Sequence, residues 1–300
     1  MKKVNYAAVD IGSNAVRLLI KSINEEGSPE GLMSKIQLIR VPLRLGEDAF
    51  TVGEISKEKT EKLVRLMKAY KQLMKIYDVA DYRICATSAM RDASNGKEIT
   101  YKIARKTGMQ VDIIDGQEEA RLVYDNHIEQ LFAPGQHYLY VDVGGGSTEI
   151  DLISDGELKS SRSYNIGTVR MLSGMVKEEV KEEMRIHLSK LDAMFAPIRI
   201  IGSGGNINKL FRLAEEKDKK NSLLPVASLQ ALYETLAPLS KEQRMEQFKL
   251  KPDRADVIVP AAEIFLDIAR RVHATDILVP TIGVADGIID SLYMAALRRG

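Results

Sequence analysis

Two stretches of this chain, Val9-Asp10-Ile11-Gly12-Ser13-Asn14 and Val141-Asp142-Val143-Gly144-Gly145-Gly146, share one pattern. Each has a short apolar run that ends in an aspartate and a glycine turn, and a second apolar run follows. This pattern predicts two antiparallel strands joined by a tight turn. The two aspartates lie 132 positions apart, close to half of the 300 residues. A duplicated domain explains this spacing, although short strings of this kind also recur by chance.

Helical and strand patterns alternate along the rest of the chain. Strand patterns occupy residues 82–86, 111–114, 162–164, 199–201 and 276–279. Helical patterns occupy residues 55–77, 98–107, 117–130, 167–175, 178–195, 228–237, 261–272 and 283–297. This alternation predicts an α/β protein. We expect a first domain over residues 1–125, a second over 126–287, a closing helix at 288–300 that completes the first domain, and a hinge near 125–137.

Composition narrows the classes of partner. Apolar residues make up 45% of the chain, and 43 Lys and Arg against 42 Asp and Glu leave a net charge of +1. Bulk charge therefore gives no reason to expect nucleic acid as a partner. The apolar run after Lys3 meets Asp10, and no run approaches the roughly eighteen residues that span a bilayer. With a single cysteine, Cys85, the chain is expected in the cytoplasm, away from membranes.

The loop from Asp142 to Glu149 is the clearest chemical signal. Three consecutive glycines, Gly144, Gly145 and Gly146, remove every Cβ, so that backbone N–H groups can crowd against an anion. Ser147 and Thr148 add hydroxyl groups. Phosphate is the anion that such loops usually hold, and the alternative is a plain tight turn. Because Ser13 and Asn14 occupy the matching turn of the first hairpin, we expect two facing hairpins to grip one phosphate chain.

Acidic residues flank these turns. Asp10 and Asp142 occupy matching positions, and Glu149 closes the second loop. Carboxylates gathered around phosphate predict a shared Mg²⁺ ion. The alternative is that each aspartate caps its own turn.

Three further segments are candidates for the site. Thr87, Ser88 and Arg91 follow a predicted strand, where two hydroxyls and a guanidinium suit a phosphate clamp. Gly204 and Gly205 follow another strand and precede a helix, which is the setting of an anion loop. Glu119 lies in the first turn of a predicted helix, where an ionised carboxylate could take a proton from water. Ordinary turn chemistry and helix stabilisation are the alternative explanations.

Taken together, these motifs resemble the family of exopolyphosphatases and guanosine-pentaphosphate phosphohydrolases (Ppx/GppA). The matching stretches are Asp10-Ile-Gly-Ser-Asn, Ala86-Thr-Ser-Ala-Met-Arg-Asp-Ala, Gly116-Gln-Glu-Glu-Ala-Arg-Leu, Asp142-Val-Gly-Gly-Gly-Ser-Thr-Glu, Gly167-Thr-Val-Arg and Gly202-Ser-Gly-Gly-Asn. They run in order over nearly the whole chain. The resemblance implies two duplicated actin-like domains of the ribonuclease H-like (ASKHA) fold, with a cleft between them.

The resemblance also implies roles and a reaction. Glu119 would activate the attacking water, Arg91 would clamp phosphate, and the glycine loop with the Ser13–Asn14 turn would cradle the phosphate chain. Asp10, Asp142 and Glu149 would organise Mg²⁺, with Mn²⁺ as the alternative ion. The implied reaction is release of orthophosphate from inorganic polyphosphate by in-line attack of water. A homodimer is compatible with the resemblance, but no motif indicates one.

Three other functions stay open at this point. Removal of the 5′ phosphate of guanosine pentaphosphate, a step of alarmone metabolism, would use the same site. An ATP-dependent kinase of the same fold and a non-catalytic nucleotide sensor are the remaining alternatives.

The chain departs from the family twice. No histidine–aspartate signature of a longer helical region occurs, and a stretch that commonly carries arginine in the family reads Gly283-Val-Ala-Asp-Gly287. The first departure leads us to expect lower processivity or a preference for shorter chains.

Overall fold

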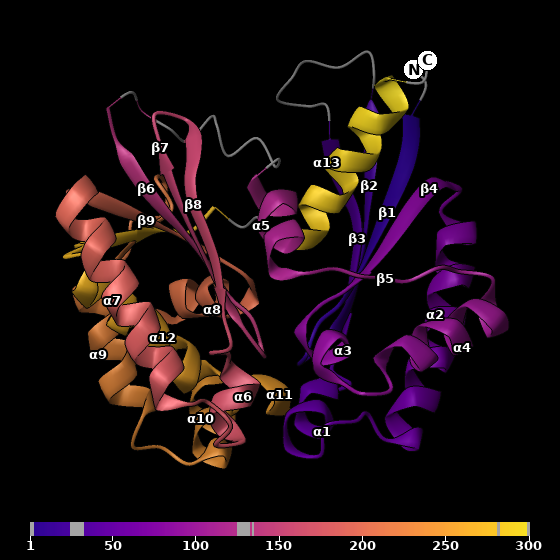
Figure 1. Cartoon of the computed structure of the whole chain (residues 1–300), viewed down its shortest axis with the longest axis horizontal. Coiled ribbons are helices and arrows are strands. Elements are labelled where there is room, and N and C mark those ends of the chain that lie inside the picture. Colours follow the sequence, from indigo (N-terminus) through magenta and orange to yellow (C-terminus); the bar gives the residue numbers. More distant parts are fainter. Residues whose placement is uncertain (1–2, 25–32, 125–132, 134, 281–282, 299–300) are drawn as a thin grey trace. The chain divides into compact units, whose positions relative to one another are not determined.

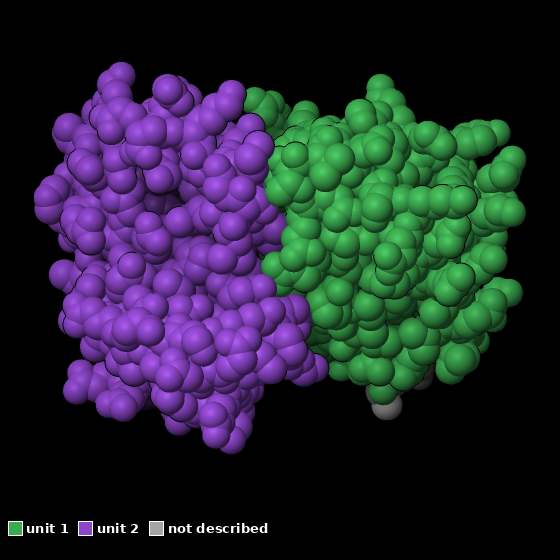
Figure 2. Space-filling model, turned by 90° about the horizontal axis from the view of Figure 1, so that it is seen from below, with its two compact units in different colours: residues 1–126, 283–300 green, residues 127–282 purple. Residues whose placement is uncertain are grey.

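The computed structural model describes residues 3–24, 33–124, 133, 135–280 and 283–298. The chain divides into two compact units. Unit 1 comprises residues 1–126 and 283–300, and unit 2 comprises residues 127–282 (Figure 2). The predicted hinge at 125–137 falls largely outside the described residues. None of the described helices has the length and apolar character needed to cross a bilayer.

Unit 1 is built on a five-stranded sheet in the order β3-β2-β1-β4-β5. Its strands are β1 (Lys3–Ile11), β2 (Val16–Asn24), β3 (Met33–Val41), β4 (Val79–Ala86) and β5 (Asp112–Ile113). Its helices are α1 (Leu45–Thr51), α2 (Lys57–Ile76), α3 (Ser88–Asp92), α4 (Gly96–Thr107), α5 (Gly116–Tyr124) and α13 (Val284–Leu297). In Figure 1, α5 and α13 lie on one side of this sheet, and α2 and α4 lie on the other.

Unit 2 is built on a six-stranded sheet in the order β10-β11-β9-β6-β7-β8. Its strands are β6 (His137–Val143), β7 (Thr148–Ser154), β8 (Glu157–Tyr164), β9 (Ile198–Ser203), β10 (Leu223–Pro225) and β11 (Asp276–Leu278). Its helices are α6 (Thr168–Leu172), α7 (Glu178–Phe195), α8 (Gly205–Leu213), α9 (Val226–Leu236), α10 (Lys241–Phe248), α11 (Pro252–Ala255) and α12 (Ile258–Arg271) (Figure 1).

The two sheets share one topology. In unit 1, β1, β2 and β3 form an antiparallel meander, and β4 and β5 add parallel strands beside β1. In unit 2, β6, β7 and β8 form the meander, β9 and β11 are the parallel strands, and β10 is an added antiparallel edge. Both predicted hairpins are therefore present at matching places. This agreement supports duplication, because chance repetition of a short string would not reproduce five strands in order.

Short elements escaped the sequence analysis. Helix α3 (Ser88–Asp92), between the strand predicted at 82–86 and the helix predicted at 98–107, was not anticipated. Strand β3 and helices α1, α10 and α11 were also not anticipated. Each is too brief, or too exposed along one side, to show a clear hydrophobic period. The long helix α2 was anticipated, and its Ser56 side chain accepts the Lys59 N–H (3.4 Å) as an N-cap.

Alternation along β6 places the core and the polar groups on opposite faces of the unit 2 sheet. Leu139, Val141 and Val143 are buried in a cluster with residues of α7, α8, α9 and α12. The intervening residues, Tyr140 and Asp142, point to the other face. The strand thus presents an aspartate at its carboxyl end, next to the turn, while its apolar side chains anchor it to the helices.

A buried histidine links α7 to strand β8. His187 is 8% exposed, and its Nδ1 lies 2.7 Å from the Tyr164 hydroxyl while its Nε2 lies 3.2 Å from the Ser160 hydroxyl. Burial, together with the nearby Arg162 and Lys190 cations, lowers the pKa of His187 to about 4. The imidazole is therefore neutral in the folded protein near pH 6.

We predict that acid destabilises the fold through this histidine. The pKa is about 4 when folded against 6.5 unperturbed, so the unfolded chain binds the proton first as pH falls. The stabilisation is complete above pH 6.5 and is lost between there and about pH 4, by roughly 3 kcal/mol in all. Urea unfolding between pH 8 and pH 4 measures it.

The matched variant is His187→Gln, which removes the titrating group. Its free energy of unfolding should differ from wild type by a constant between pH 8 and pH 7, and the difference should shrink below pH 6.5. Parallel curves for the two proteins down to pH 4 would contradict the assignment.

Candidate active site

The glycine loop of unit 2 is a closed turn between β6 and β7. The Gly144 N–H donates to the Ser147 carbonyl (3.0 Å), which closes the turn. Asp142 and Glu149 are direct cross-strand partners at the base of the hairpin. The turn thus holds two carboxylates side by side, immediately below three residues without Cβ atoms.

The start of α6 occupies the carbonyl side of this loop. The Thr168 N–H donates to the Gly144 carbonyl (3.0 Å), and the N–H groups of Val169 and Arg170 donate to the Gly145 carbonyl (2.8 and 3.0 Å). Within a trans peptide the carbonyl and the following N–H point in opposite directions. The N–H groups of Gly145 and Gly146 therefore point away from α6, and together they form a concave donor surface of the kind that binds anions.

Each carboxylate of this hairpin has a hydroxyl partner. The Ser163 hydroxyl donates to Glu149 Oε1 (2.8 Å), and Glu149 is 3% exposed. The Ser203 hydroxyl lies 3.4 Å from Asp142 Oδ2. Hydroxyl donors stabilise the ionised carboxylates and fix their orientation.

Asp151, two residues beyond Glu149, is a further acid that the sequence analysis did not single out. Burial raises its pKa to about 7, the Asp142 charge adds to the rise, and a hydrogen bond from Ser161 opposes it. Its cross-strand partner is Tyr140. Asp151 lies two residues after Glu149 on the same strand, so the two side chains point to the same face of the sheet. This alternation is the sequence signal that could have identified Asp151.

The loop between β9 and α8 approaches Asp142. Gly204 has φ +93°, and a Cβ on it would lie 2.7 Å from Asp142 Oδ1. Gly205 begins α8, and a Cβ there would lie 2.4 Å from an Arg254 guanidinium nitrogen. Arg254 also donates to Asn206 Oδ1. The structure therefore brings Gly204 to Asp142 and places Arg254, which was not predicted, over the start of α8.

The matching turn of unit 1 is built in the same way. The Gly12 N–H donates to the Ala15 carbonyl (3.2 Å) and closes the turn. The start of α1 again occupies the carbonyl side, since Gly46 N–H donates to the Ser13 carbonyl (2.9 Å) and Arg44 N–H to the Asn14 carbonyl (3.0 Å). The duplicated units thus repeat a turn and a short helix whose first residues donate to the turn carbonyls, although the individual donor–acceptor pairs differ.

Asp10 in this turn is buried and carries its own counterion. Its Oδ2 accepts from Arg17 Nη1 (2.9 Å), and Arg17 is its cross-strand partner on β2. Burial raises the pKa of Asp10, while the Arg17 charge and hydrogen bond oppose that rise. Arg17 was not predicted. The hairpin register would have identified it, because it is the basic residue directly opposite Asp10.

The segment after β4 meets the unit 1 turn and α5. The Ser13 and Ser88 hydroxyls lie 2.8 Å apart, and the Thr87 N–H donates to the Ile11 carbonyl (3.2 Å). Arg91 Nη1 donates to the Ile114 carbonyl (2.7 Å) and lies 3.9 Å from Glu119 Oε2. The guanidinium favours an ionised Glu119 at the start of α5. Unit 1 therefore brings together Ser13 with Ser88, and Arg91 with Glu119.

One predicted phosphate ligand has a different position. Thr148 is fully buried, and its hydroxyl donates to the Ile166 carbonyl (2.6 Å). A proton used in this way cannot also be donated to phosphate. Thr148 therefore fixes β7 to the segment before α6, whereas Ser147, 2% exposed, remains at the turn itself.

Among the residues that the structure describes, no cluster of three or more His, Cys, Asp or Glu side chains is arranged to hold a metal ion. Asp142 and Glu149 form a pair. Mg²⁺ binds through oxygen ligands and commonly takes only one or two carboxylates, with water and substrate phosphate filling the other positions. The pair therefore fits Mg²⁺ in type and number.

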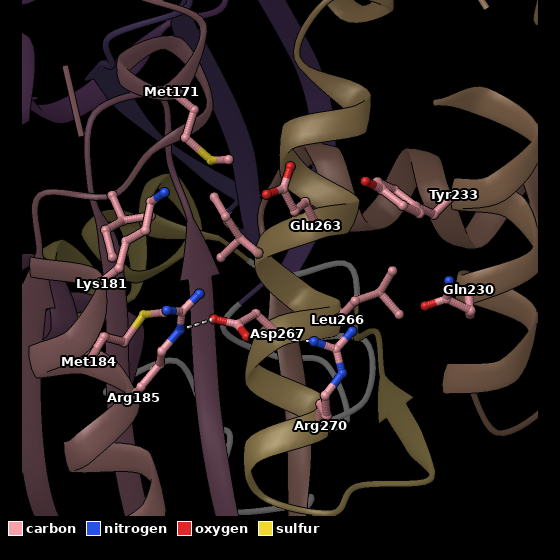
Figure 3. A pocket seen from close by; sticks show the side chains of 12 residues that line it. Met171, Lys181, Met184, Arg185, Gln230, Tyr233, Glu263, Leu266, Asp267 and Arg270 are labelled. Carbon is pink, nitrogen blue, oxygen red and sulfur yellow. Dashed lines mark hydrogen bonds and ion pairs between the residues drawn. The ribbon is translucent and has the colours of Figure 1, made fainter. Parts of the chain in front are cut away.

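A cavity of about 200 Å³ lies in unit 2 among residues of α6, α7, α9 and α12 (Figure 3). Arg185 of α7 approaches Asp267 of α12 there, with Nε 3.3 Å from Oδ2. Met184 and Leu266 are apolar residues of its lining. None of the predicted site residues lines this cavity, so it is separate from the glycine loop.

Comparison with known proteins agrees with the geometry of the two turns. The sequence profile of the Ppx/GppA phosphatase family matches residues 22–295. The chain belongs to the Ppx/GppA phosphatase family. This assignment confirms the expected class of enzyme, a hydrolase that acts on phosphoanhydrides.

Individual relatives cover nearly the whole chain. This chain is 27% identical to Exopolyphosphatase 2 of Mycobacterium tuberculosis, and the alignment covers 97% of this chain and 99% of that protein. The crystal structure of the Aquifex aeolicus Ppx/GppA family member is similar, with a TM-score of 0.76 at 25% identity, covering 98% of this chain and 99% of that one. An exopolyphosphatase from Cytophaga hutchinsonii shares the fold, with a TM-score of 0.83 at 22% identity, covering 97% and 98%. The predicted fold class, an α/β protein of two duplicated domains, is confirmed.

The stretch Gly283–Gly287 begins α13, and its acidic residue, Asp286, has two partners. Asp286 Oδ2 accepts the Gly283 N–H (3.1 Å) at the start of α13. Its Oδ1 pairs with Lys21 Nζ of β2 (2.7 Å). The acidic residue therefore caps the helix and joins it to the unit 1 sheet.

We predict that Gly204→Ala disables the site through Asp142. The added Cβ would collide with the Asp142 carboxylate, and misplacement of a reacting group by about 1 Å can cost on the order of 100-fold in rate. Gly204 has φ +93° and ψ 168°, a backbone region that essentially only glycine adopts, so alanine there should cost about 1–3 kcal/mol in stability. Steady-state phosphate release and urea unfolding measure the two effects.

Gly156→Ala is the matched control. Gly156 has φ +76°, and a Cβ there would meet nothing within 4 Å. It should lose similar stability and keep wild-type activity. Equal loss of activity in both variants, or in neither, would contradict a role for the Gly204–Asp142 contact.

Proposed function

We propose that this Ppx/GppA family member is an exopolyphosphatase, which hydrolyses the terminal phosphoanhydride bond of inorganic polyphosphate and releases orthophosphate. The observation that carries the proposal is the glycine loop of unit 2. Its N–H groups gather on the side opposite α6, beside a pair of carboxylates. The name of the Mycobacterium tuberculosis relative supports polyphosphate as the substrate.

The loop suits a chain of phosphates better than a single neutral ligand. Backbone N–H groups donate to phosphate oxygens without regard to what is attached at the far end. Ser147 at the turn adds a hydroxyl, and the glycines allow the backbone to approach closely. Such donors bind a terminal phosphoryl group and also stabilise the charge that it carries during transfer.

Asp142 and Glu149 would hold Mg²⁺, with Mn²⁺ as the alternative. When bound, the ion would neutralise phosphate charge and draw electron density from the transferred group. The Ser163 and Ser203 hydroxyls donate to these two carboxylates and orient them. Asp10, whose carboxylate pairs with Arg17, is the third acid proposed for the ion.

Glu119 is the proposed general base. It would remove a proton from water as the water oxygen forms a bond to the terminal phosphorus, and the bridging P–O bond would break with its electrons staying on the shortened chain. Arg91 Nη1, 3.9 Å from Glu119 Oε2, places a positive charge beside this carboxylate. Positioning and charge neutralisation supply most of the catalysis of such a transfer.

We predict that Glu119→Gln lowers kcat by roughly 100- to 10,000-fold, the range that general-base catalysis contributes. KM should change little, because the amide keeps the size of the side chain. Phosphate release from polyphosphates of several lengths, in Mg²⁺ and in Mn²⁺, measures this effect.

Glu118→Gln is the matched control on the same helical turn. Glu118 Oε1 pairs with Arg83 Nη2 (2.6 Å), so its removal affects a surface ion pair. Its kcat should stay close to wild type. Full activity of Glu119→Gln would contradict the assigned base.

Guanosine pentaphosphate is the alternative substrate, because its 5′ end is also a short chain of phosphates. The two substrates should be compared side by side with the same enzyme. Polyphosphate should have the higher kcat/KM. A strong preference for guanosine pentaphosphate would overturn the proposed substrate, while leaving the hydrolytic site in place.

A further inference from the structure

The three glycines of unit 2 need an external restraint. Glycine accepts many backbone conformations, so a run of three can turn its N–H groups in several directions at little cost. Anion binding requires all of these groups to point the same way. What fixes them is therefore part of the phosphate site, although it need not touch phosphate.

Two of the three loop carbonyls are fixed by backbone donors. Thr168 binds Gly144, and Val169 and Arg170 bind Gly145. This close approach requires glycine at the preceding position, since a Cβ on Gly167 would lie 2.5 Å from backbone atoms of Gly145 and Gly146. Gly167 has an extended backbone with φ −145°, so the demand is steric.

The third carbonyl is fixed by a side chain. Arg170 Nε donates to the Gly146 carbonyl (2.7 Å), and Arg170 is 9% exposed. The N–H of the same peptide group belongs to Ser147, and it must point away from Arg170. Through this one bond Arg170 sets the direction of the last donor in the loop.

Unit 1 shows that this third bond is a repeated requirement. Its matching carbonyl, that of Asn14, accepts the backbone N–H of Arg44 (3.0 Å). In unit 2 no backbone donor is recorded at the equivalent Gly146 carbonyl among the described residues, and the Arg170 side chain takes that place. The two units satisfy the same carbonyl by different means.

We propose that Arg170 is a positioning residue for phosphate hydrolysis: it holds the Gly146–Ser147 peptide so that the Ser147 N–H faces the substrate phosphate. This inference rests on the proposed function of the loop. Without the bond, the Gly146 peptide rotates toward another donor, and the loop loses one of its three aligned N–H groups. Phosphate is then bound less tightly, and the transferred group is less well stabilised.

Two substitutions separate the hydrogen bond from the charge and from packing. Arg170→Gln places a neutral amide nitrogen at the position of Nε, because both nitrogens are the fourth heavy atom from Cα. Arg170→Met has similar reach and no donor. Arg270→Met is the control, since the Arg270 side chain is 70% exposed on α12.

We expect Arg170→Met to lower kcat/KM for polyphosphate by roughly 10- to 100-fold, through both a higher KM and a lower kcat, as for loss of one donor from an anion site. Arg170→Gln should retain activity within about fivefold of wild type if the donor is what matters. Arg270→Met should match wild type. Calorimetric titration with inorganic phosphate should show weaker binding for Arg170→Met alone.

The outcomes are distinct. If Arg170 had a purely structural role, its replacement would reduce the folded fraction, which thermal unfolding measures. KM and phosphate affinity of the folded protein would stay unchanged, and this result would overturn the proposal. Equal loss in the Gln and Met variants would also overturn it, because charge would then be the cause. If wild type released no phosphate from polyphosphate, the proposed function would fail, and the phosphate titration would still decide the role of Arg170.

Discussion

The site depends on hydrogen bonds between a short helix and the carbonyl groups of a glycine turn. In unit 2 the start of α6 binds the carbonyls of Gly144 and Gly145, and in unit 1 the start of α1 binds those of Ser13 and Asn14. Because peptide groups are planar, a carbonyl that is held on one side commits the next N–H to the other. The donors of the turn are thus oriented before any phosphate arrives, and binding need not meet the cost of ordering them.

The two units use this arrangement for different purposes. Unit 2 combines its turn with two carboxylates, Asp142 and Glu149, each oriented by a serine hydroxyl. Unit 1 combines its turn with an aspartate that is already neutralised by Arg17, and it carries the proposed base on α5. The common topology explains the shared hydrogen bonds, while the chemistry follows from the side chains that each hairpin presents.

The sequence predicted what a hydrophobic or glycine pattern records directly. The hairpins, the long helix α2 and the pairing of Asp142 with Glu149 follow from strand alternation and turn composition. It could not predict the hydrogen bonds from α6 to the glycine loop, because backbone N–H groups donate them and nearly every residue type carries such a group. Thr148 shows the same limit: a hydroxyl beside a phosphate loop suggested a ligand, and only the fold shows that Ile166 receives its proton. Arg17 could have been found from the hairpin register. Arg170 belongs to a motif already quoted, but its bond to Gly146, like the position of Arg254, required the tertiary structure.

The most direct test of the central claim is amide NMR of ¹⁵N-labelled protein titrated with inorganic phosphate. If the turn of unit 2 is a preoriented anion site, the amide protons of Gly145, Gly146 and Ser147 should shift downfield together, with one shared affinity. The amide of Gly156, a glycine of the turn between β7 and β8, should stay in place. Phosphate binding that leaves these three amides unmoved would contradict the account.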